Sequence, residues 1–386
     1  MSLIHLFNPE NDLALAHGKS NYTAPPNAMA LHHAGEALPF WFANSNDVVI
    51  APNLGPKWLD EIKSKTNIEA SIFNPTIHNI GYKACPWGWS LDALRQLTTV
   101  GVNNDALISP SQIEDIRQLS HRRTTIEILS RLNESLTFQL PPLPFEAKTP
   151  KDVIAFAKRH NGCYIKSPWS SSGRGVVNAS ALSESELTRR AEGIIRRQGS
   201  IMCETPLDKI TDFAMLFYSD GIKVKQMGYS LFFTGNSTAY SGNITTSDAI
   251  IEHHLSTMIS IEQLHNTSHA LENALTDIIA PKYTGFFGVD MLIYNENGAN
   301  KIAPCIEVNL RMTMGIVAWH LYRNHLAPNS EAIMRVEYGN DSSSKKSSIF
   351  EDKKLVEGSL DLIPPGTNFH ITLDATRASK MLQFSI

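Results

Sequence analysis

Apolar residues recur along the chain with two spacings, one typical of helices and one typical of strands. The longest helical pattern covers residues 261–279, where Leu264, Leu271, Leu275 and Ile278 share one face. Short apolar runs closed by Gly, Asn, Asp or Pro indicate strands. The pattern therefore predicts a protein of mixed helices and strands. Helices are expected over residues 27–41, 119–132, 150–160 and 261–279, and strands over residues 3–7, 48–51, 164–166, 201–204, 213–218, 223–229, 287–294 and 302–310.

Strands and helices alternate up to about residue 115, which predicts a separate small α/β domain. Within it, the polar residues 8–12 follow the first strand, at the strand end where α/β folds hold ligands. The same residues fit a helix start, with Asn8 as the cap and Pro9 in the first turn, and this interpretation is favoured. Trp87 and Trp89 flank a glycine in a stiff loop, where they line a pocket or, the favoured alternative, fill a domain interface.

A hairpin is predicted over residues 287–310, and it carries three side chains with oxygen ligands. Its turn is built from the Asn and Gly residues of positions 295–300. Glu307 and Asn309 are two residues apart and so share one strand face, and strand pairing brings Asp290 near them. Two carboxylates and an amide oxygen form a set that suits Mg²⁺. The alternative is a strand pair whose acids are simply solvated.

A second polar stretch follows a short strand that ends at Lys166. Residues 170–176 read Ser-Ser-Ser-Gly-Arg-Gly-Val, and such small residues let the backbone curl and direct its N–H groups at an anion. The stretch lacks the Gly-Lys-Ser/Thr ending of a Walker loop, and it also fits a plain turn. Together with the predicted metal ligands downstream, it becomes a candidate phosphate-binding loop. The candidate phosphate ligands are Lys166, Ser171, Ser172, Gly173, Arg174 and Gly175.

The composition indicates an ordinary globular protein with a large core, because 42% of the 386 residues are hydrophobic and 19% are charged. The net charge of −4 argues against a nucleic-acid binder that works through bulk positive charge. Four scattered cysteines form neither a zinc-binding nor a disulfide pattern. No apolar run reaches the ~20 residues of a membrane span, and the first residues lack the features of a signal peptide. We therefore expect a cytoplasmic protein without a membrane or nucleic-acid partner; an oligomer is compatible with the sequence.

Taken in order along the chain, these motifs resemble the ATP-grasp superfamily, which includes D-alanine–D-alanine ligase, biotin carboxylase and glycinamide ribonucleotide synthetase. The similarity covers residues 119–317, and its strongest part is Gly288-Val289-Asp290 followed by Glu307-Val308-Asn309-Leu310-Arg311. The resemblance implies an α/β and α+β fold, in which a small N-terminal α/β domain precedes two lobes that hold ATP between them. The implied domains are the N-terminal pre-ATP-grasp domain (1–115), the two grasp lobes (116–200 and 201–338), and a linker with a β-rich tail that packs on the grasp lobe (339–386).

The resemblance also assigns roles to single residues. The family has a phosphate-binding lysine at a helix start, and here Arg122, or its neighbour Arg123, takes that place, where a guanidinium can make the same contact. The remaining implied roles belong to Lys166 at the phosphates, Glu204 and Thr205 at a hinge that reads adenine, Asp212 at the ribose hydroxyls, and Arg311 at an oxyanion.

The resemblance implies an enzyme that uses ATP with one or two Mg²⁺ ions, or Mn²⁺ in their place, and in which Lys166 and Arg311 are catalytic. A small-molecule carboxylate would be activated as an acyl phosphate and attacked by an amine, with amino acids and peptides as candidate substrates. Two alternatives stay open: a kinase of the same fold that stops after phosphoryl transfer, and a nucleotide-binding sensor or partner subunit without turnover. The Asp-Glu-Asn-Arg set disfavours the sensor.

Overall fold

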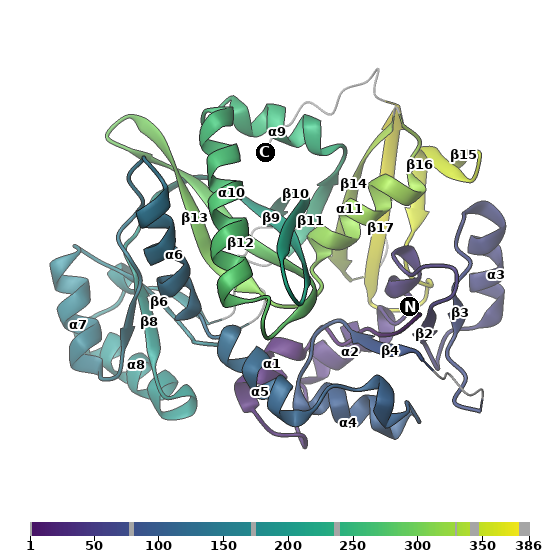
Figure 1. Cartoon of the computed structure of the whole chain (residues 1–386), viewed down its shortest axis with the longest axis horizontal. Helices are drawn as coiled ribbons and strands as arrows, with labels where there is room; N and C mark the ends of the chain where they lie inside the picture. Colours follow the sequence, from purple (N-terminus) through teal and green to yellow (C-terminus); the bar gives the residue numbers. More distant parts are fainter. Residues whose placement is uncertain are drawn as a thin grey trace. The chain divides into compact units, whose positions relative to one another are not determined.

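The computed structural model of the chain describes residues 2–76, 81–170, 175–234, 240–328, 330–339 and 347–377. The chain forms two compact units, each built from segments that are distant in the sequence (Figure 1). Unit 1 comprises the residues up to Glu114, Tyr229–Ile251 and the residues from Arg311 onward. Unit 2 comprises Asp115–Gly228 and Glu252–Leu310.

Unit 1 contains a four-stranded parallel sheet with the strand order β3-β2-β1-β4. Its first two strands are short and, apart from His5, apolar, as expected for parallel strands that are covered on both faces. The elements of this part are β1 (Leu3–Leu6), α1 (Asn11–His17), α2 (Pro26–Ala34), η1 (Leu38–Trp41), β2 (Val48–Ile50), α3 (Pro56–Lys65), β3 (Ser71–Ile72), β4 (Lys83–Pro86), α4 (Leu91–Thr99) and η2 (Asn104–Ala106).

A buried ion pair fixes the start of this sheet. His5 Nε2 on β1 lies 3.1 Å from Asp47 Oδ2, and the two side chains are 5% and 1% exposed. Asp47 also accepts hydrogen bonds of 2.8 Å from the backbone N–H groups of Leu3 and Asn44. Burial alone would lower the pKa of His5, but its hydrogen bonds with Asp47 and Cys85 raise the pKa to about 9. The pair is therefore charged at neutral pH, and the carboxylate oxygens of Asp47 have hydrogen-bond donors within this part of the fold.

Unit 1 also holds an antiparallel sheet, in which the strands follow the order β10-β11-β14-β17-β16-β15. Helix α11 packs against β11 and β14. The indole Nε1 of Trp41 donates to the carbonyl of Leu362 at 2.7 Å, which ties η1 to the segment after β16. The elements are β11 (Tyr240–Thr245), α11 (Met314–His325), β14 (Ser330–Tyr338), β15 (Ile349–Glu351), β16 (Lys354–Asp361) and β17 (Phe369–Arg377), together with the part of β10 (Val224–Thr234) from Tyr229 onward and the part of α9 (Asp248–Ser256) up to Ile251.

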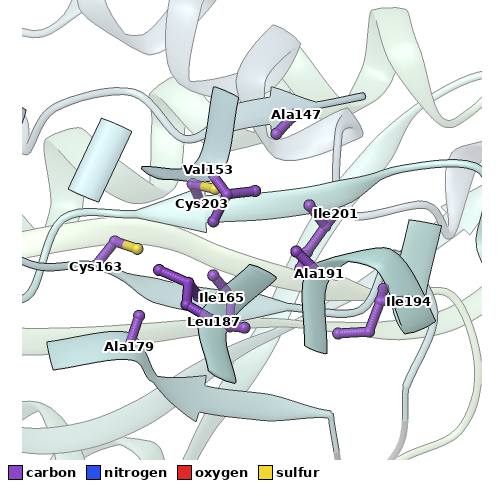
Figure 2. Packing of buried hydrophobic residues seen from close by; sticks show 10 residues of the cluster. All are labelled: Ala147, Val153, Cys163, Ile165, Ala179, Leu187, Ala191, Ile194, Ile201 and Cys203. Carbon is purple, nitrogen blue, oxygen red and sulfur yellow. The ribbon is translucent and has the colours of Figure 1, made fainter. Parts of the chain in front are cut away.

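Unit 2 contains a four-stranded antiparallel sheet with the order β5-β8-β6-β7. Helices α7 and α8 begin at capping boxes set by Thr149 and Ser183. Their apolar faces, with Val153 on α7 and Leu187 on α8, pack with Ile165 of β6 in one buried cluster (Figure 2). The elements are β5 (Phe145–Ala147), α7 (Pro150–Arg159), β6 (Tyr164–Lys166), β7 (Val176–Asn178), η3 (Ala179–Ala181), α8 (Glu184–Gln198) and β8 (Ile201–Glu204).

The rest of unit 2 is a long antiparallel ribbon with the strand order β13-β12-β9. Its hairpin turns at Asn297 and Gly298, whose φ angles of 55° and 83° suit the tight turn of a twisted hairpin. Pro304, which has no N–H to donate, lies where the β12–β13 register shifts in a bulge. Helix α6 packs on β13 and on α10 (Figure 1). The elements are α6 (Thr124–Ser135), β9 (Asp208–Asp220), α10 (Ile261–Ile278), β12 (Thr284–Glu296) and β13 (Ala299–Asn309).

Two sequence-based helix predictions need correction. Residues 119–132 do not form one helix, because α5 (Pro110–Leu119) ends where that helix was expected to begin and α6 starts at Thr124. The chain turns between them, and the Arg122 N–H donates to the carbonyl of Pro168 at 3.1 Å instead of to a preceding helical carbonyl. Residues 27–41 split into α2 and η1 on either side of Gly35, a weak helix former. None of the helices in the described ranges has the length and apolar character needed to span a bilayer.

Candidate functional site

The three oxygen-bearing side chains of the hairpin lie together in unit 2. Asp290 on β12 and Glu307 on β13 are register partners, and Asn309 is paired with Gly288 two residues along. Asn309 Nδ2 donates to Asp290 Oδ2 at 3.1 Å. The structure thus brings the predicted ligand set together, and its binding of a metal stays a prediction.

Negative charge is concentrated around these side chains. Burial and the charges of Asp290, Glu204 and Glu307 raise the pKa of the Cys305 thiol on β13, so three carboxylates act on one buried group. Within the described ranges, no group of three or more His, Cys, Asp or Glu side chains is arranged to hold a metal. The set here instead combines two acids with the Asn309 amide. Such a set of carboxylate and amide oxygens fits the preference of Mg²⁺.

Arg122 lies next to the acids and is 5% exposed. One of its terminal nitrogens, Nη2, is 2.8 Å from Glu307 Oε1 and 3.0 Å from Ser170 Oγ, and its Nε donates to the Ser167 carbonyl at 3.1 Å. A guanidinium this deeply buried requires such acceptors, because an unpaired buried charge is costly. Arg122 therefore links β13 to the segment that enters the predicted phosphate loop. Its neighbour Arg123 is directed to Gln118 and Glu146 instead.

Lys166 and Glu204 form a second ion pair in unit 2. Lys166 ends β6, Glu204 ends the neighbouring strand β8, and their side chains are 9% and 15% exposed. The sequence assigned Lys166 to phosphate and Glu204 to adenine, whereas in this structure each charge neutralises the other. Both side chains are thereby held at the ends of their strands, and a nucleotide that contacts them would have to replace this pairing.

The predicted phosphate loop is only partly described, because Ser171, Ser172, Gly173 and Arg174 lie outside the described residues. The base of the loop is closed by the Ser167 N–H, which donates to the Gly175 carbonyl at 2.9 Å. Gly175 has a φ of 83°, a left-handed conformation that favours glycine. A Cβ on Gly175 would also lie 2.8 Å from Ser167 Oγ. The ends of β6 and β7 are therefore joined at a position that only glycine fits without strain.

Two predicted nucleotide contacts have partners of their own. Asp212 on β9 is ion-paired with Lys209 at 2.6 Å. Thr205 Oγ1 lies 3.4 Å from His160 Nδ1. Among the described contacts, neither of them joins the cluster of Arg122 and the hairpin acids, and their roles at ribose and adenine stay predictions.

Arg311 belongs to unit 1, where it is paired with Asp12 of α1. Its Nε donates to both carboxylate oxygens of Asp12 at 2.9 Å, and its Nη2 lies 2.7 Å from Asp12 Oδ2. The next residue, Met312, donates its N–H to the carbonyl of Trp87 at 2.8 Å. The ring of the buried Trp87 packs edge-on against Phe7, so this tryptophan is part of the unit 1 core.

The expected helix start within residues 8–12 is present, but Asn8 does not cap the helix and Pro9 does not lie in its first turn. Helix α1 begins at Asn11, and no side chain caps it. Asn8 is instead 1% exposed, with its Nδ2 donating to the Gly88 carbonyl at 2.8 Å. The Gly88 N–H donates back to Asn8 Oδ1 at 3.3 Å. Asn8 therefore joins the loops that follow β1 and β4, a long-range role that the local sequence does not reveal.

No protein-family model and no curated protein sequence matches this chain, whereas many solved structures resemble it. Biotin carboxylase from Campylobacter jejuni, in complex with an ATP analogue, is 10% identical, with 97% of this chain and 88% of that chain covered and a TM-score of 0.53. Phosphoribosylamine–glycine ligase from Thermotoga maritima is 11% identical, with 97% and 92% covered and a TM-score of 0.51. Both are ATP-grasp enzymes. This chain has the ATP-grasp fold.

The ATP-grasp fold confirms the expected fold class, including an α/β domain at the N-terminal end. A third ATP-grasp structure, the biotin carboxylase domain of 2-oxoglutarate carboxylase from Hydrogenobacter thermophilus, contains MgADP and bicarbonate. It is 13% identical, with 98% of this chain and 86% of that chain covered and a TM-score of 0.53. At such identities the likeness establishes the fold of this chain and no more.

Sequence reasoning missed two features of this chain. It placed Asp12 in a polar junction but gave it no partner, because 299 residues separate it from Arg311. It also assigned Lys166 and Glu204 to different parts of a nucleotide without pairing them. The register of two antiparallel strands, β6 and β8, brings them together, and nothing in the sequence near either residue specifies that register.

Proposed function

We propose that this protein is an ATP- and Mg²⁺-dependent ligase that joins a small-molecule carboxylate to an amine through an acyl phosphate. The observation that carries the proposal is the grouping of Asp290, Glu307 and Asn309 on one hairpin of an ATP-grasp fold, with the cation Arg122 in contact with Glu307. Three solved structures of the same fold, two of them with an adenine nucleotide bound, support it.

The hairpin residues would hold the metal. Asp290, Glu307 and Asn309 offer carboxylate and amide oxygens, and Mg²⁺ bound there supplies positive charge that offsets the charge of the transferred phosphoryl group. Arg122 and Lys166 then leave Glu307 and Glu204 and contact phosphate oxygens, with charge-assisted hydrogen bonds replacing the ion pairs of this structure.

The remaining residues bind and orient the substrates. The loop of Ser171, Ser172, Gly173, Arg174 and Gly175 directs backbone N–H groups to the phosphates. Glu204 and Thr205 contact adenine, and Asp212 contacts the ribose hydroxyls. The substrate carboxylate attacks the γ-phosphorus as ADP leaves, and the amine then attacks the acyl carbon as phosphate leaves. Arg311 stabilises the oxyanion of that second step.

The domain assignment that accompanies this function is a pre-ATP-grasp domain over residues 1–115 and grasp lobes over residues 116–200 and 201–338. Residues 339–386 add a linker and a β-rich tail. The substrates proposed are small molecules, with amino acids and peptides as the first classes to test.

A screen for ADP release tests the proposal. Amino acids and dipeptides are supplied as the acid, with and without an amine, and ADP is measured in Mg²⁺ and in excess chelator. We expect release only when metal, acid and amine are all present. Release without an amine would make the protein a kinase, and ATP binding without any release would make it a sensor.

Calorimetry tests the metal part separately. Without a divalent ion, the carboxylates of Asp290 and Glu307 repel the phosphates of ATP, so we expect ATP to bind measurably only when Mg²⁺ is present. Equal ATP affinity in excess chelator would remove the hairpin acids from the proposed metal site.

A further inference from the structure

Several contacts within unit 1 hold the side chain of Arg311 in place. Its guanidinium meets Asp12 through three contacts of 2.7–2.9 Å, and each side chain is 15% exposed. Its Nη1 donates to the carbonyl of Met312 at 3.1 Å. A planar guanidinium held along one edge by a carboxylate has few rotamers left, so Asp12 determines where the other edge of Arg311 points.

The backbone next to Arg311 is fixed as well. The Met312 N–H is bonded to Trp87 in the loop after β4, and Thr313 caps α11 by accepting from the Ile316 N–H at 3.3 Å. Asp12 belongs to α1, which follows β1. Asn8 and Gly88 join these two loops through a pair of hydrogen bonds. Arg311 is thus anchored twice, through its side chain and through the adjacent backbone, to the loops at the carboxyl ends of β1 and β4.

The strand order makes these two strand ends special. In the order β3-β2-β1-β4, the connection after β1 leads to β2 on one side, whereas β4 lies on the other side of β1. The carboxyl ends of β1 and β4 therefore form the point at which the winding of the sheet reverses. Open parallel sheets commonly bind their ligands at this point, because the two connections diverge there. Asp12 and Trp87 place Arg311 at that point.

We propose that Asp12 is a positioning residue for the ligase reaction, which acts by orienting Arg311 toward the oxyanion formed when the amine attacks. The proposal rests on the proposed function, since it takes its substrate and its reaction from there. It adds that the small α/β domain contributes to the rate through a carboxylate that need not touch the substrate. Asp12 carries out this role through charge and geometry together, because both carboxylate oxygens contact Arg311.

Kinetics of Asp12→Asn provide the first test. The substitution keeps the shape but removes the charge, and the misoriented guanidinium should lower kcat roughly 10- to 100-fold. The KM for ATP should change by less than about twofold, because the proposed phosphate contacts are Lys166, Arg122 and the loop after β6. Asp12→Glu, which keeps a carboxylate, should recover part of kcat. An Asp12→Asn enzyme with wild-type kcat would overturn the proposal.

Asp92→Asn is the matched control. Asp92 also lies in the first turn of a unit 1 helix, and it is paired with Arg95 at 2.6 Å. The same chemical change there should leave kcat near the wild-type value. Equal losses in both variants would mean that any broken ion pair of unit 1 impairs the enzyme. If Asp12→Asn unfolds while Arg311→Met stays folded, Asp12 has a structural role. Either equal losses in the two Asn variants or this loss of folding overturns the proposal.

An NMR measurement separates this inference from the proposed function. In protein labelled with ¹⁵N-arginine, the Nε–H signal of Arg311, assigned by its loss in Arg311→Lys, should be slow to exchange in the wild type. In Asp12→Asn it should broaden or shift, while the Arg95 signal stays unchanged. This readout needs no turnover, so a wild-type protein that releases no ADP refutes the function alone. An unchanged Arg311 signal in Asp12→Asn refutes the positioning role whether or not the protein is an active ligase.

Discussion

The ion pairs His5–Asp47 in unit 1 and Arg122–Glu307 in unit 2 have similar distances, 3.1 and 2.8 Å, but different surroundings. Asp47 is 1% exposed and its oxygens also accept two backbone N–H groups, so its demand for partners is met by the sheet itself. Glu307 is 23% exposed and is the register partner of another acid, Asp290. A pair with all its partners inside the fold is structural. The pair Arg122–Glu307, which has the carboxylate of Asp290 beside it, is suited to bind a metal cation.

The largest effect is expected from Glu307→Gln, which should abolish most of the catalytic activity. The change removes one charge from the proposed metal ligands while Gln still offers an oxygen to Arg122. We expect the rate of ADP release to fall by about 100-fold or more, because metal charge stabilisation is lost. The melting temperature should change little, since relief of the repulsion from Asp290 offsets the weaker contact with Arg122.

Glu296→Gln is the control for this prediction. Glu296 lies on the same hairpin and is paired with Lys301 near the turn. Its substitution should leave ADP release intact. A Glu307→Gln protein with a lower melting temperature and normal turnover would place Glu307 in the same structural class as Asp47.

Asp47→Ala should have the opposite profile, with a large loss of stability and no direct effect on nucleotide binding. Removal of Asp47 takes the buried acceptor away from the His5 ring and from two backbone N–H groups, which should cost about 3–5 kcal/mol of unfolding free energy. Chemical denaturation measures it. Glu61→Ala, which breaks the exposed pair Glu61–Lys65 on α3, should leave the unfolding midpoint unchanged. A similar midpoint for both variants would contradict the structural assignment of Asp47.

Lys166→Ala sharpens the comparison within unit 2. The loss of one charge-assisted phosphate contact should weaken ATP binding by about 1.5–3 kcal/mol, measured by calorimetry with Mg²⁺ present. Lys148→Ala, which removes an exposed cation close to the same sheet, serves as the control and should bind ATP normally. Wild-type affinity in Lys166→Ala would mean that Lys166 serves only to neutralise Glu204.

A pH dependence of stability is also expected, and it comes from His5. Its pKa is raised in the folded protein to about 9 from an ordinary value of 6.5. Folding therefore favours the protonated ring, and this stabilisation is complete below pH 6.5 and is lost as the pH rises through 9. Melting temperatures between pH 6 and 9.5 should fall more steeply for the wild type than for Asp47→Ala. Parallel curves would show that the pair does not hold the proton on His5.

The sequence predicted the hairpin of β12 and β13 well, because each of its determinants is local. Asn297 and Gly298 specify the turn, and alternating side chains specify the faces, so the grouping of Asp290, Glu307 and Asn309 followed from short-range rules. The break between α5 and α6 could not be predicted in the same way. At this break the Arg122 N–H donates to the carbonyl of Pro168, a residue 46 positions later.

The charge partners were the least predictable part of the site. Glu307 has Arg122 as its counter-ion and Glu204 has Lys166, and both pairs depend on how strands and loops meet in the folded unit. The spacing of hydrophobic residues and the composition of turns carry no information about these contacts between strands and loops. Asp12 illustrates the limit, since its chemistry was visible in the sequence but its partner Arg311 was not.

The hydrogen bond from Trp41 to Leu362 has a consequence for the order in which the chain can fold. Trp41 is completely buried, and its indole donor is satisfied by a residue 321 positions later. During synthesis, therefore, this contact of η1 cannot form until almost the entire chain has been made, by which point every segment of unit 2 has been synthesised. Until then the nascent chain exposes apolar surface around η1, where a chaperone would be expected to bind.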